Sequence, residues 1–385
     1  MKKIAIIIIL LIVILYPTTC YAEDITDDEI MHMQKESVNI SKFISEAEKY
    51  TSSILEDTDV TTMLNDAIAG KIDNEKLAKS LLGLLGNETI SSMKTIASIM
   101  IVIVIHSILK SITEGLENGK GISQISYYIQ FILIVTLIMN NFADIITMTK
   151  DSISNLVSFS NTLIPVLITL VITTGNIVSA NILQPILLFL ITFIGNFIQN
   201  IILPIILAST VLGIVSKISE RVQLDRLSKF FKSTSVWVLC VILTLFVSLV
   251  SLEGTLSSSV DGITTKTAKA AVSSFVPVVG KILSDAVDTV IGCASILKNA
   301  VGIVGVIVIL CICISPILKL LFLMITYYIG AAICQPIADK KIVKLLEQMG
   351  DTFKVLLAIL CSISVMLIIG TTLVMKISNS SMMYR

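Results

Sequence analysis

The chain has 385 residues, of which 55% are hydrophobic and only 15% are charged, and its mean hydropathy is +0.93. Soluble domains are about half apolar and a quarter charged, so this composition excludes an ordinary soluble protein and predicts a polytopic membrane protein. The 28 basic and 28 acidic residues balance. The chain therefore has no overall basic field that would recruit nucleic acid.

Residues 1–22 have the pattern of a secretory signal peptide. Lys2 and Lys3 precede an uncharged run from Ile4 to Leu15, and small residues then lead to a cleavage point after Ala22. An export signal would place the start of the mature chain outside the cytoplasm.

Residues 23–92 are polar, but apolar residues recur in them at helical spacing, as at Ile40, Phe43, Ile44 and Ala47. This spacing predicts a small helical region on the extracytoplasmic side, made of short amphipathic helices. An amphipathic face does not identify what covers it. Two interpretations stay open: the helices pack on one another, or they dock a partner.

Apolar segments long enough to cross a bilayer follow. The expected single crossings are Thr95–Ile112, Ile125–Ile146, Leu156–Thr174, Thr234–Leu252 and Phe353–Met375. Two further tracts, 177–216 and 301–334, are too long for one crossing at about 20 residues per span. We expect the first to break near Gln199-Asn200, with Pro204 opening its second arm, and the second to be interrupted at Pro316 and Lys319. The total is about eight to ten spans, with two transmembrane helices in residues 93–155.

Two short loops, 217–232 and 339–354, are rich in Lys and Arg, so the positive-inside rule predicts that both are cytoplasmic. The carboxyl-terminal tail, 376–385, then lies outside. The candidate contacts for a cytoplasmic partner are Arg221, Arg226, Lys340 and Lys341.

A weak internal repeat has an offset of 112 residues. The segment around Pro165 (NTLIPV) aligns with the segment around Pro277 (SSFVPV), and a second pair of prolines aligns at the same offset. The pattern predicts an all-α transmembrane helical bundle with parallel repeats of about four helices. The first repeat covers 156–252, and the second lies within 253–375 after an extracytoplasmic loop.

A stripe of charged and small residues interrupts the apolar half of the chain. Lys281, Asp285 and Asp288 are spaced i, i+4, i+7, so they share one face of a helix, and Gly292 continues that face. At the repeat offset the three charged positions correspond to Thr169, Thr173 and Asn176, which are also polar.

Three interpretations of the charged stripe stay open. Lys281 and Asp285 can pair on one helix turn, which would make the stripe a structural feature of a packed bundle. Ionisable residues within membranes also line aqueous paths. Alternatively, residues 253–300 form an external loop with solvated charges. Pro277 and Gly280 would bend the chain near the start of the stripe.

Motifs for catalysis are missing from the sequence. It has no Gly-rich nucleotide-binding loop with a lysine, no HExxH and only two histidines. Six of the seven cysteines fall in or beside apolar runs, and none forms a CxxC pair. We therefore expect no catalytic, cofactor-binding or metal site.

Two segments carry a resemblance to a known family. They are SFVPVVGKILSDAVDTVIGCASILKNAVG at residues 274–302 and, with less specificity, NTLIPVLITLVITTG at residues 161–175. Together with the predicted signal peptide and the polar region before the spans, they resemble the stage III sporulation protein AE family of endospore-forming bacteria. The resemblance covers nearly the whole chain in length and layout.

The resemblance implies a non-enzymatic membrane subunit of a channel complex that joins mother cell and forespore and supports forespore development after engulfment. The protein would lie in the mother-cell membrane around the forespore, the outer forespore membrane, with its exported region in the intermembrane space. Its implied partners are membrane lipid, a cytoplasmic ATPase and ring-forming proteins of the complex, but no nucleic acid. A membrane scaffold that recruits the complex and a stand-alone secondary transporter remain alternatives.

Overall fold

The computed structural model describes residues 40–52, 59–71, 97–105, 107–108, 119–218, 224–275 and 279–382. The predicted signal peptide lies outside these ranges. Within them the chain forms helices and no strand, which confirms the all-α prediction. The helices are α3 (Ile40–Thr51), α4 (Val60–Ile68), α6 (Gly119–Thr173), α7 (Ile177–Phe197), the π-helix η1 (Ile198–Ile202), α8 (Leu203–Ile218), α9 (Asp225–Phe275), α10 (Val279–Cys334) and α11 (Lys340–Met382).

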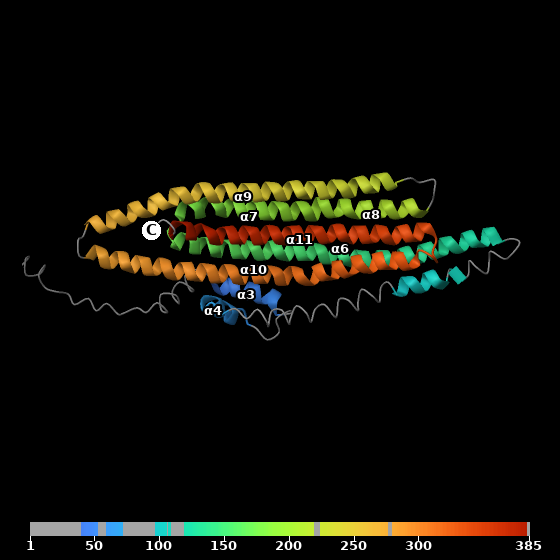
Figure 1. The fold of residues 1–385 in the computed structure, drawn as a ribbon, viewed down its shortest axis with the longest axis horizontal. Helices are drawn as coiled ribbons and strands as arrows, with labels where there is room; N and C mark the ends of the chain where they lie inside the picture. The colour runs from blue at the N-terminus through green and yellow to red at the C-terminus, as the bar shows by residue number, and fades with distance from the viewer. Residues whose placement is uncertain are drawn as a thin grey trace, which may run out of the picture.

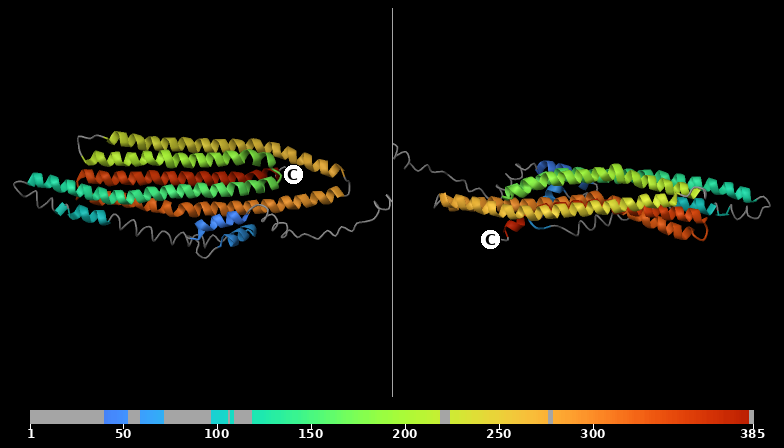
Figure 2. Two further views of the ribbon diagram at one scale, coloured as in Figure 1. Left: turned by 180° about the vertical axis from the view of Figure 1, so that it is seen from behind. Right: turned by 90° about the horizontal axis from the view of Figure 1, so that it is seen from above.

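Long rods lying side by side make up the bundle (Figure 1). Helices α7, η1 and α8 join into one rod. This rod and α10 run in one direction, and α6, α9 and α11 run in the opposite direction. Helix α10 packs mainly against α11 and α6, whereas α9 packs against α7, α8 and α11. The short helices α3 and α4 lie against α10, on the side of the bundle away from α9 (Figures 1 and 2).

The turn between α6 and α7 depends on a glycine. Gly175 has φ of 87°, a conformation that costs a residue with a Cβ atom but not glycine. Its N–H donates to the Ile172 carbonyl at 2.9 Å, and the Asn176 N–H donates to the Val171 carbonyl at 3.3 Å. This Schellman arrangement satisfies the last carbonyls of α6 and reverses the chain.

The two expected breaks in the long tracts are wrong. At the first, the structure places the five-residue π-helix η1, and the chain continues straight into α8. Pro204 lies in the first turn of α8, where a missing N–H is tolerated, and the π-turn absorbs the irregularity. Pro316 likewise lies inside the continuous helix α10. Packed neighbours make such prolines tolerable in membrane helices.

The expected crossings Ile125–Ile146 and Leu156–Thr174 are joined in one helix, α6. The polar residues between them do not end the helix, because Thr149 and Ser152 donate their hydroxyls to carbonyls four residues earlier. The boundary drawn at residues 155 and 156 therefore falls inside α6. The first proposed repeat contains the end of α6, the α7–η1–α8 rod and the first part of α9. The second contains the rods α10 and α11, in place of about four separate helices.

Five of the described helices are long and apolar enough to cross a membrane. The segments are Tyr128–Thr173, Ile177–Lys217, Asp225–Leu252, Val287–Cys334 and Lys340–Ile377. At 1.5 Å per residue the 41-residue segment from Ile177 measures about 62 Å, twice the roughly 30 Å of bilayer hydrocarbon. One perpendicular crossing would therefore use about half of this rod.

Charged residues locate the part of the bundle that matches a bilayer. Uncharged runs of 20 to 22 residues occur in four helices: 152–173 in α6, 233–252 in α9, 299–318 in α10 and 355–375 in α11. A helix of that length spans about 30 Å. Charged residues bound both ends of the runs in α9, α10 and α11.

Contacts bring the four runs into register. Lys298 Nζ donates to the Met375 carbonyl at 2.6 Å at one boundary, and Lys232 Nζ donates to Thr352 Oγ1 at 3.1 Å at the other. Between these levels the side chain of Leu163 abuts the backbone of Gly305 and aligns α6 with α10. We call this region the hydrophobic slab. The end of the bundle at which α8 turns into α9 and α10 into α11 is called the basic end.

Candidate functional site

The charged stripe lies on the first four turns of α10. Asp288 is half-buried, and a Cβ atom added at Gly292 would meet no atom within 4 Å. The side chains of Lys281 and Asp285 lie outside the described part of the structure. Because Lys298 marks the slab boundary, Asp288 and Gly292 lie about 15 Å and 9 Å beyond it, at the end opposite the basic end.

Of the two family-motif positions near the stripe, Pro277 lies outside the described residues and Gly280 lies in the first turn of α10. Pro165 lies inside α6, which continues through it to Thr173.

The uncharged stripe, Thr169, Thr173 and Asn176, lies at the end of α6. The Thr169 hydroxyl donates to the Pro165 carbonyl and the Thr173 hydroxyl to the Thr169 carbonyl, both at 2.8 Å. Asn176 is buried in the turn, and its Nδ2 donates to Thr174 Oγ1 at 3.0 Å. These hydroxyls are satisfied by their own helix, so the threonines can face lipid, water or protein.

The structure brings the two stripes to adjoining heights. Leu163 contacts Gly305, and α6 and α10 are antiparallel, so a step of six residues places Thr169 level with Asn299. The same count places Asn176 level with Gly292. Thr169 therefore lies just inside the slab boundary and Asn176 about 9 Å beyond it, at the height where the charged stripe begins.

Lys298 is a buried charge that the stripe pattern missed. Its side chain is fully buried, and its ammonium donates to the Met375 carbonyl of α11. One turn later, a Cβ atom at Gly302 would overlap the Met375 side chain, so α10 and α11 are in close contact here. A single lysine in an otherwise apolar run is the sequence signal that could have identified it.

Helices α3 and α4 dock on the bundle. The apolar side chains of α3 face inward, and the rings of Phe43 and Tyr50 each lie 6.1 Å from the ring of Phe159 in α6. Helix α4 packs against α10, with Asp59 as its N-cap, accepting from the Thr61 N–H at 3.2 Å. These two helices do pack on each other, but they also cover α6 and α10 of their own chain.

Electrostatics on α3 are those of a solvated helix. Lys49 Nζ donates to Glu46 at 2.6 Å, and the Tyr50 hydroxyl donates to the same carboxylate at 3.3 Å. Burial raises the pKa of the Tyr50 phenol, and the neighbouring Glu46 carboxylate raises it further. The remaining charged side chains of α3 are exposed.

Polar contacts tie the helices together at the basic end. Ser209 and Ser228 exchange hydrogen bonds, each hydroxyl donating to the other residue's carbonyl at 2.6 and 2.7 Å. Gln348 Nε2 donates to the Thr210 carbonyl at 3.3 Å, and Lys232 reaches Thr352. These contacts join α8, α9 and α11.

The predicted partner contacts lie at this same end. Arg226 and Lys340 are exposed in the first turns of α9 and α11, and Lys341 is half-buried. Arg221 lies outside the described residues. The structure therefore brings three of the four predicted residues to one end of the bundle.

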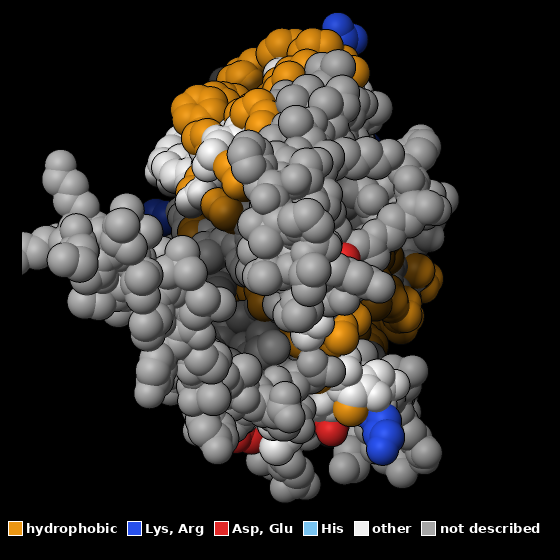
Figure 3. Space-filling view, turned by 90° about the vertical axis from the view of Figure 1, so that its left-hand side faces the viewer, with side chains coloured by type: hydrophobic (Ala, Val, Ile, Leu, Met, Phe, Trp, Pro, Cys, Tyr) orange, Lys and Arg blue, Asp and Glu red, His pale blue; other side chains and the backbone are white. Residues whose placement is uncertain are grey.

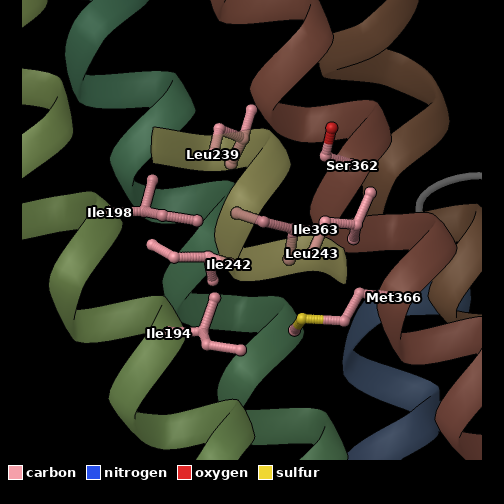
Figure 4. A pocket seen from close by; sticks show the side chains of 8 residues that line it. All are labelled: Ile194, Ile198, Leu239, Ile242, Leu243, Ser362, Ile363 and Met366. Atoms are coloured by element: carbon pink, nitrogen blue, oxygen red, sulfur yellow. The ribbon is translucent and has the colours of Figure 1, made fainter. Parts of the chain in front are cut away.

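A small cavity lies where α7, η1, α9 and α11 meet (Figure 4). Its lining consists of Ile194, Ile198, Leu239, Ile242, Leu243, Ser362, Ile363 and Met366. Because Ser362 is the single polar residue among them, the cavity has no group that could orient a charged substrate.

Comparisons with known proteins agree with the resemblance seen in the sequence. The family model described as stage III sporulation protein AE matches residues 58–378. Stage III sporulation protein AE of Bacillus subtilis (strain 168) is 32% identical over 307 residues, which cover 80% of this chain and 77% of that protein. No solved structure matches.

Proposed function

Because the chain belongs to the stage III sporulation protein AE family, we propose that it is a non-enzymatic subunit of a channel complex linking mother cell and forespore. Membership and the apolar helices make it an integral membrane protein of sporulation. The channel role is supported by one observation above all. A charged stripe on α10 runs toward the slab and ends at Gly292, about 9 Å beyond the slab boundary, where a Cβ atom would meet open space and the uncharged stripe of α6 reaches the same height.

The proposed site is the outer forespore membrane. The clustering of basic residues at one end of the bundle supports an orientation with that end in the mother-cell cytoplasm. The outer parts of α9 and α10 would then project into the intermembrane space, and residues 23–92 would reach the bundle from that side. Arg226, Lys340 and Lys341 would contact a cytoplasmic ATPase, and ring-forming proteins of the complex would meet the opposite end.

Substitution of the charged stripe tests this function. We expect Asp288→Ala, alone or with Asp285→Ala, to block sporulation after engulfment while the amount of protein in the membrane stays normal. The measurements are heat-resistant spore counts, a late forespore reporter and immunoblots of the membrane fraction. Asp144→Ala is the matched control, because Asp144 is exposed on α6 far from the stripe and its loss should change none of the three. Normal sporulation in the stripe variants would contradict the proposal.

A scaffold that anchors and recruits the complex is the second candidate. The close packing of α10 against α6 and α11 favours it, because Gly305 and Gly302 each abut a neighbouring side chain. A scaffold would tolerate the stripe substitutions yet lose its partners when the exported region is deleted, as measured by affinity purification from sporulating cells. A stand-alone transporter would move a solute when the purified chain is reconstituted alone.

A further inference from the structure

Helix α3 lies at the height of the slab interior. It is held there by the contacts of Phe43 and Tyr50 with Phe159. Phe159 is eight residues beyond Asp151, the charged residue that precedes the uncharged run of α6, so it lies about 12 Å into the slab. Figure 1 agrees, since α3 lies beside the long rods and away from both ends of the bundle.

The outward face of α3 is polar and charged. The exposed residues on it are Ser41, Lys42, Ser45, Glu48 and Lys49. Glu46 is half-buried and paired with Lys49, whose side chain remains 61% exposed. The helix therefore presents several ionised groups to its surroundings at a depth where a lipid-facing helix carries none.

This charged face of α3 is not compatible with contact to lipid. A charged side chain at the centre of a membrane helix costs roughly 2.5 to 3.5 kcal/mol, and the pairing of Lys49 with Glu46 does not include Lys42. The outward face of α3 is also a less suitable contact for another protein than for water, because Lys, Glu and Ser are depleted from the cores of protein interfaces. The composition of the face is that of a helix in water.

The other side of the bundle has the opposite character. Within its uncharged run α9 exposes Trp237, Leu245 and Leu249, with exposed fractions of 67%, 56% and 48%. Of the five candidate spans, α9 is the least buried. Viewed along the bundle, a hydrophobic cluster lies at the top with a basic side chain at its edge, further hydrophobic side chains appear lower on the right, and basic and acidic side chains appear at the bottom (Figure 3). The exposed apolar side chains of α9 are therefore compatible with contact to lipid.

We infer that the α3 side of the bundle borders a water-filled space within the thickness of the membrane, while α9 faces lipid. A single chain cannot hold water against hydrocarbon on an open side, so other copies or subunits enclose the space. This inference rests on the proposed function, because it takes the water to belong to the transport path. It adds where in the fold that path lies.

Thiol labelling of the full-length chain tests the inference. Single-cysteine variants Lys42→Cys, Lys49→Cys, Phe43→Cys and Leu245→Cys are made in a cysteine-free background that still sporulates. Membrane fragments from sporulating cells, with both faces open, are treated with a charged maleimide or with a lipid-soluble one. We expect the charged reagent to label Lys42→Cys and Lys49→Cys at least about tenfold faster than Leu245→Cys, since it reacts with hydrated thiolates. Leu245→Cys should react with the lipid-soluble reagent.

Phe43→Cys shows whether α3 is docked. Phe43 is fully buried beside exposed Lys42, so its cysteine should resist both reagents while α3 stays on α6. Labelling of Phe43→Cys as fast as Lys42→Cys would overturn the inference, because α3 would then not be held on α6 at the height of the slab. Labelling of Lys42→Cys and Lys49→Cys by the lipid-soluble reagent alone, or by neither reagent, would overturn it in favour of lipid or a protein contact. Sporulation is not part of this readout, so a failure of the proposed function would be seen separately.

Discussion

Close approach of α10 to α6 depends on a single missing side chain at Gly305. A Cβ atom there would lie 2.7 Å from Leu163 Cδ2. We expect Gly305→Leu to destabilise the protein by about 1 to 3 kcal/mol, the usual cost of overpacking a filled core. The thermal midpoint of the purified protein in detergent measures this. Gly292→Leu on the same helix is the control for stability, because its Cβ meets open space. Equal losses in both variants would contradict the packing.

Lys298 offers a second residue-scale test. Burying an ammonium against one carbonyl is costly, and even a buried ion pair can be replaced by apolar residues of similar volume with no loss of stability or a gain of about 1 to 4 kcal/mol. We therefore expect Lys298→Met to keep or raise the thermal midpoint. Lys298→Ala should lower it, because a cavity replaces the side-chain stem. A large loss in Lys298→Met would show that the hydrogen bond to Met375 outweighs the desolvation cost.

Lys281, Asp285 and Asp288 can be recognised in the sequence because their spacing of i, i+4 and i+7 places them on one helix face. Lys298 follows Lys281 by 17 residues, which rotates it about 100° off that face. Its burial arises from α11, whose carbonyl it reaches 77 positions later in the chain. Local spacing contains no such information.

At the scale of elements, the α8–α9 hairpin is held by the reciprocal hydrogen bonds of Ser209 and Ser228. A double-mutant cycle with Ser209→Ala and Ser228→Ala should give a coupling of about 0.6 to 1.7 kcal/mol, the range for hydrogen bonds between membrane helices. Ser209→Ala combined with Thr136→Ala should give none, because Thr136 bonds to its own helix. Urea or thermal unfolding in detergent supplies the four free energies. Additive single losses would show that the two hydroxyls do not act together.

Helix continuity was the least predictable element-scale property. Hydropathy identifies how much of a chain suits hydrocarbon, and it located the apolar runs of α9 and α11 well. Hydropathy does not predict whether a helix ends at the bilayer boundary or continues beyond it. Helices α6 and α10 continue because polar side chains such as Thr149 bond to their own backbone and because neighbouring rods cover them. The irregularity near Gln199-Asn200 was located correctly, but it became a π-turn rather than a loop.

In the whole molecule, the charged residues that bound the uncharged runs can be read from the sequence. The register in which the runs of different helices lie beside one another cannot. It depends on contacts such as Lys232 with Thr352 and Leu163 with Gly305, which join distant parts of the chain. The docking of α3 was equally out of reach, because an amphipathic face with Phe43 at its centre fits many apolar surfaces. The structure supplies the partner, Phe159 of α6, and with it the depth of the helix.

The two-sided bundle makes a prediction about added charge. Leu245 and Ser45 are both exposed, one on α9 and the other on α3, within the slab height. If α9 faces lipid, Leu245→Lys should cost roughly 2.5 to 3.5 kcal/mol of membrane insertion and reduce the chain in carbonate-washed membranes. Ser45→Lys should leave that amount unchanged, because water already surrounds the lysines of α3. Equal loss in both variants would place lipid on both sides and remove the basis for a wet face, whereas loss confined to Leu245→Lys assigns one environment to each side of the same bundle.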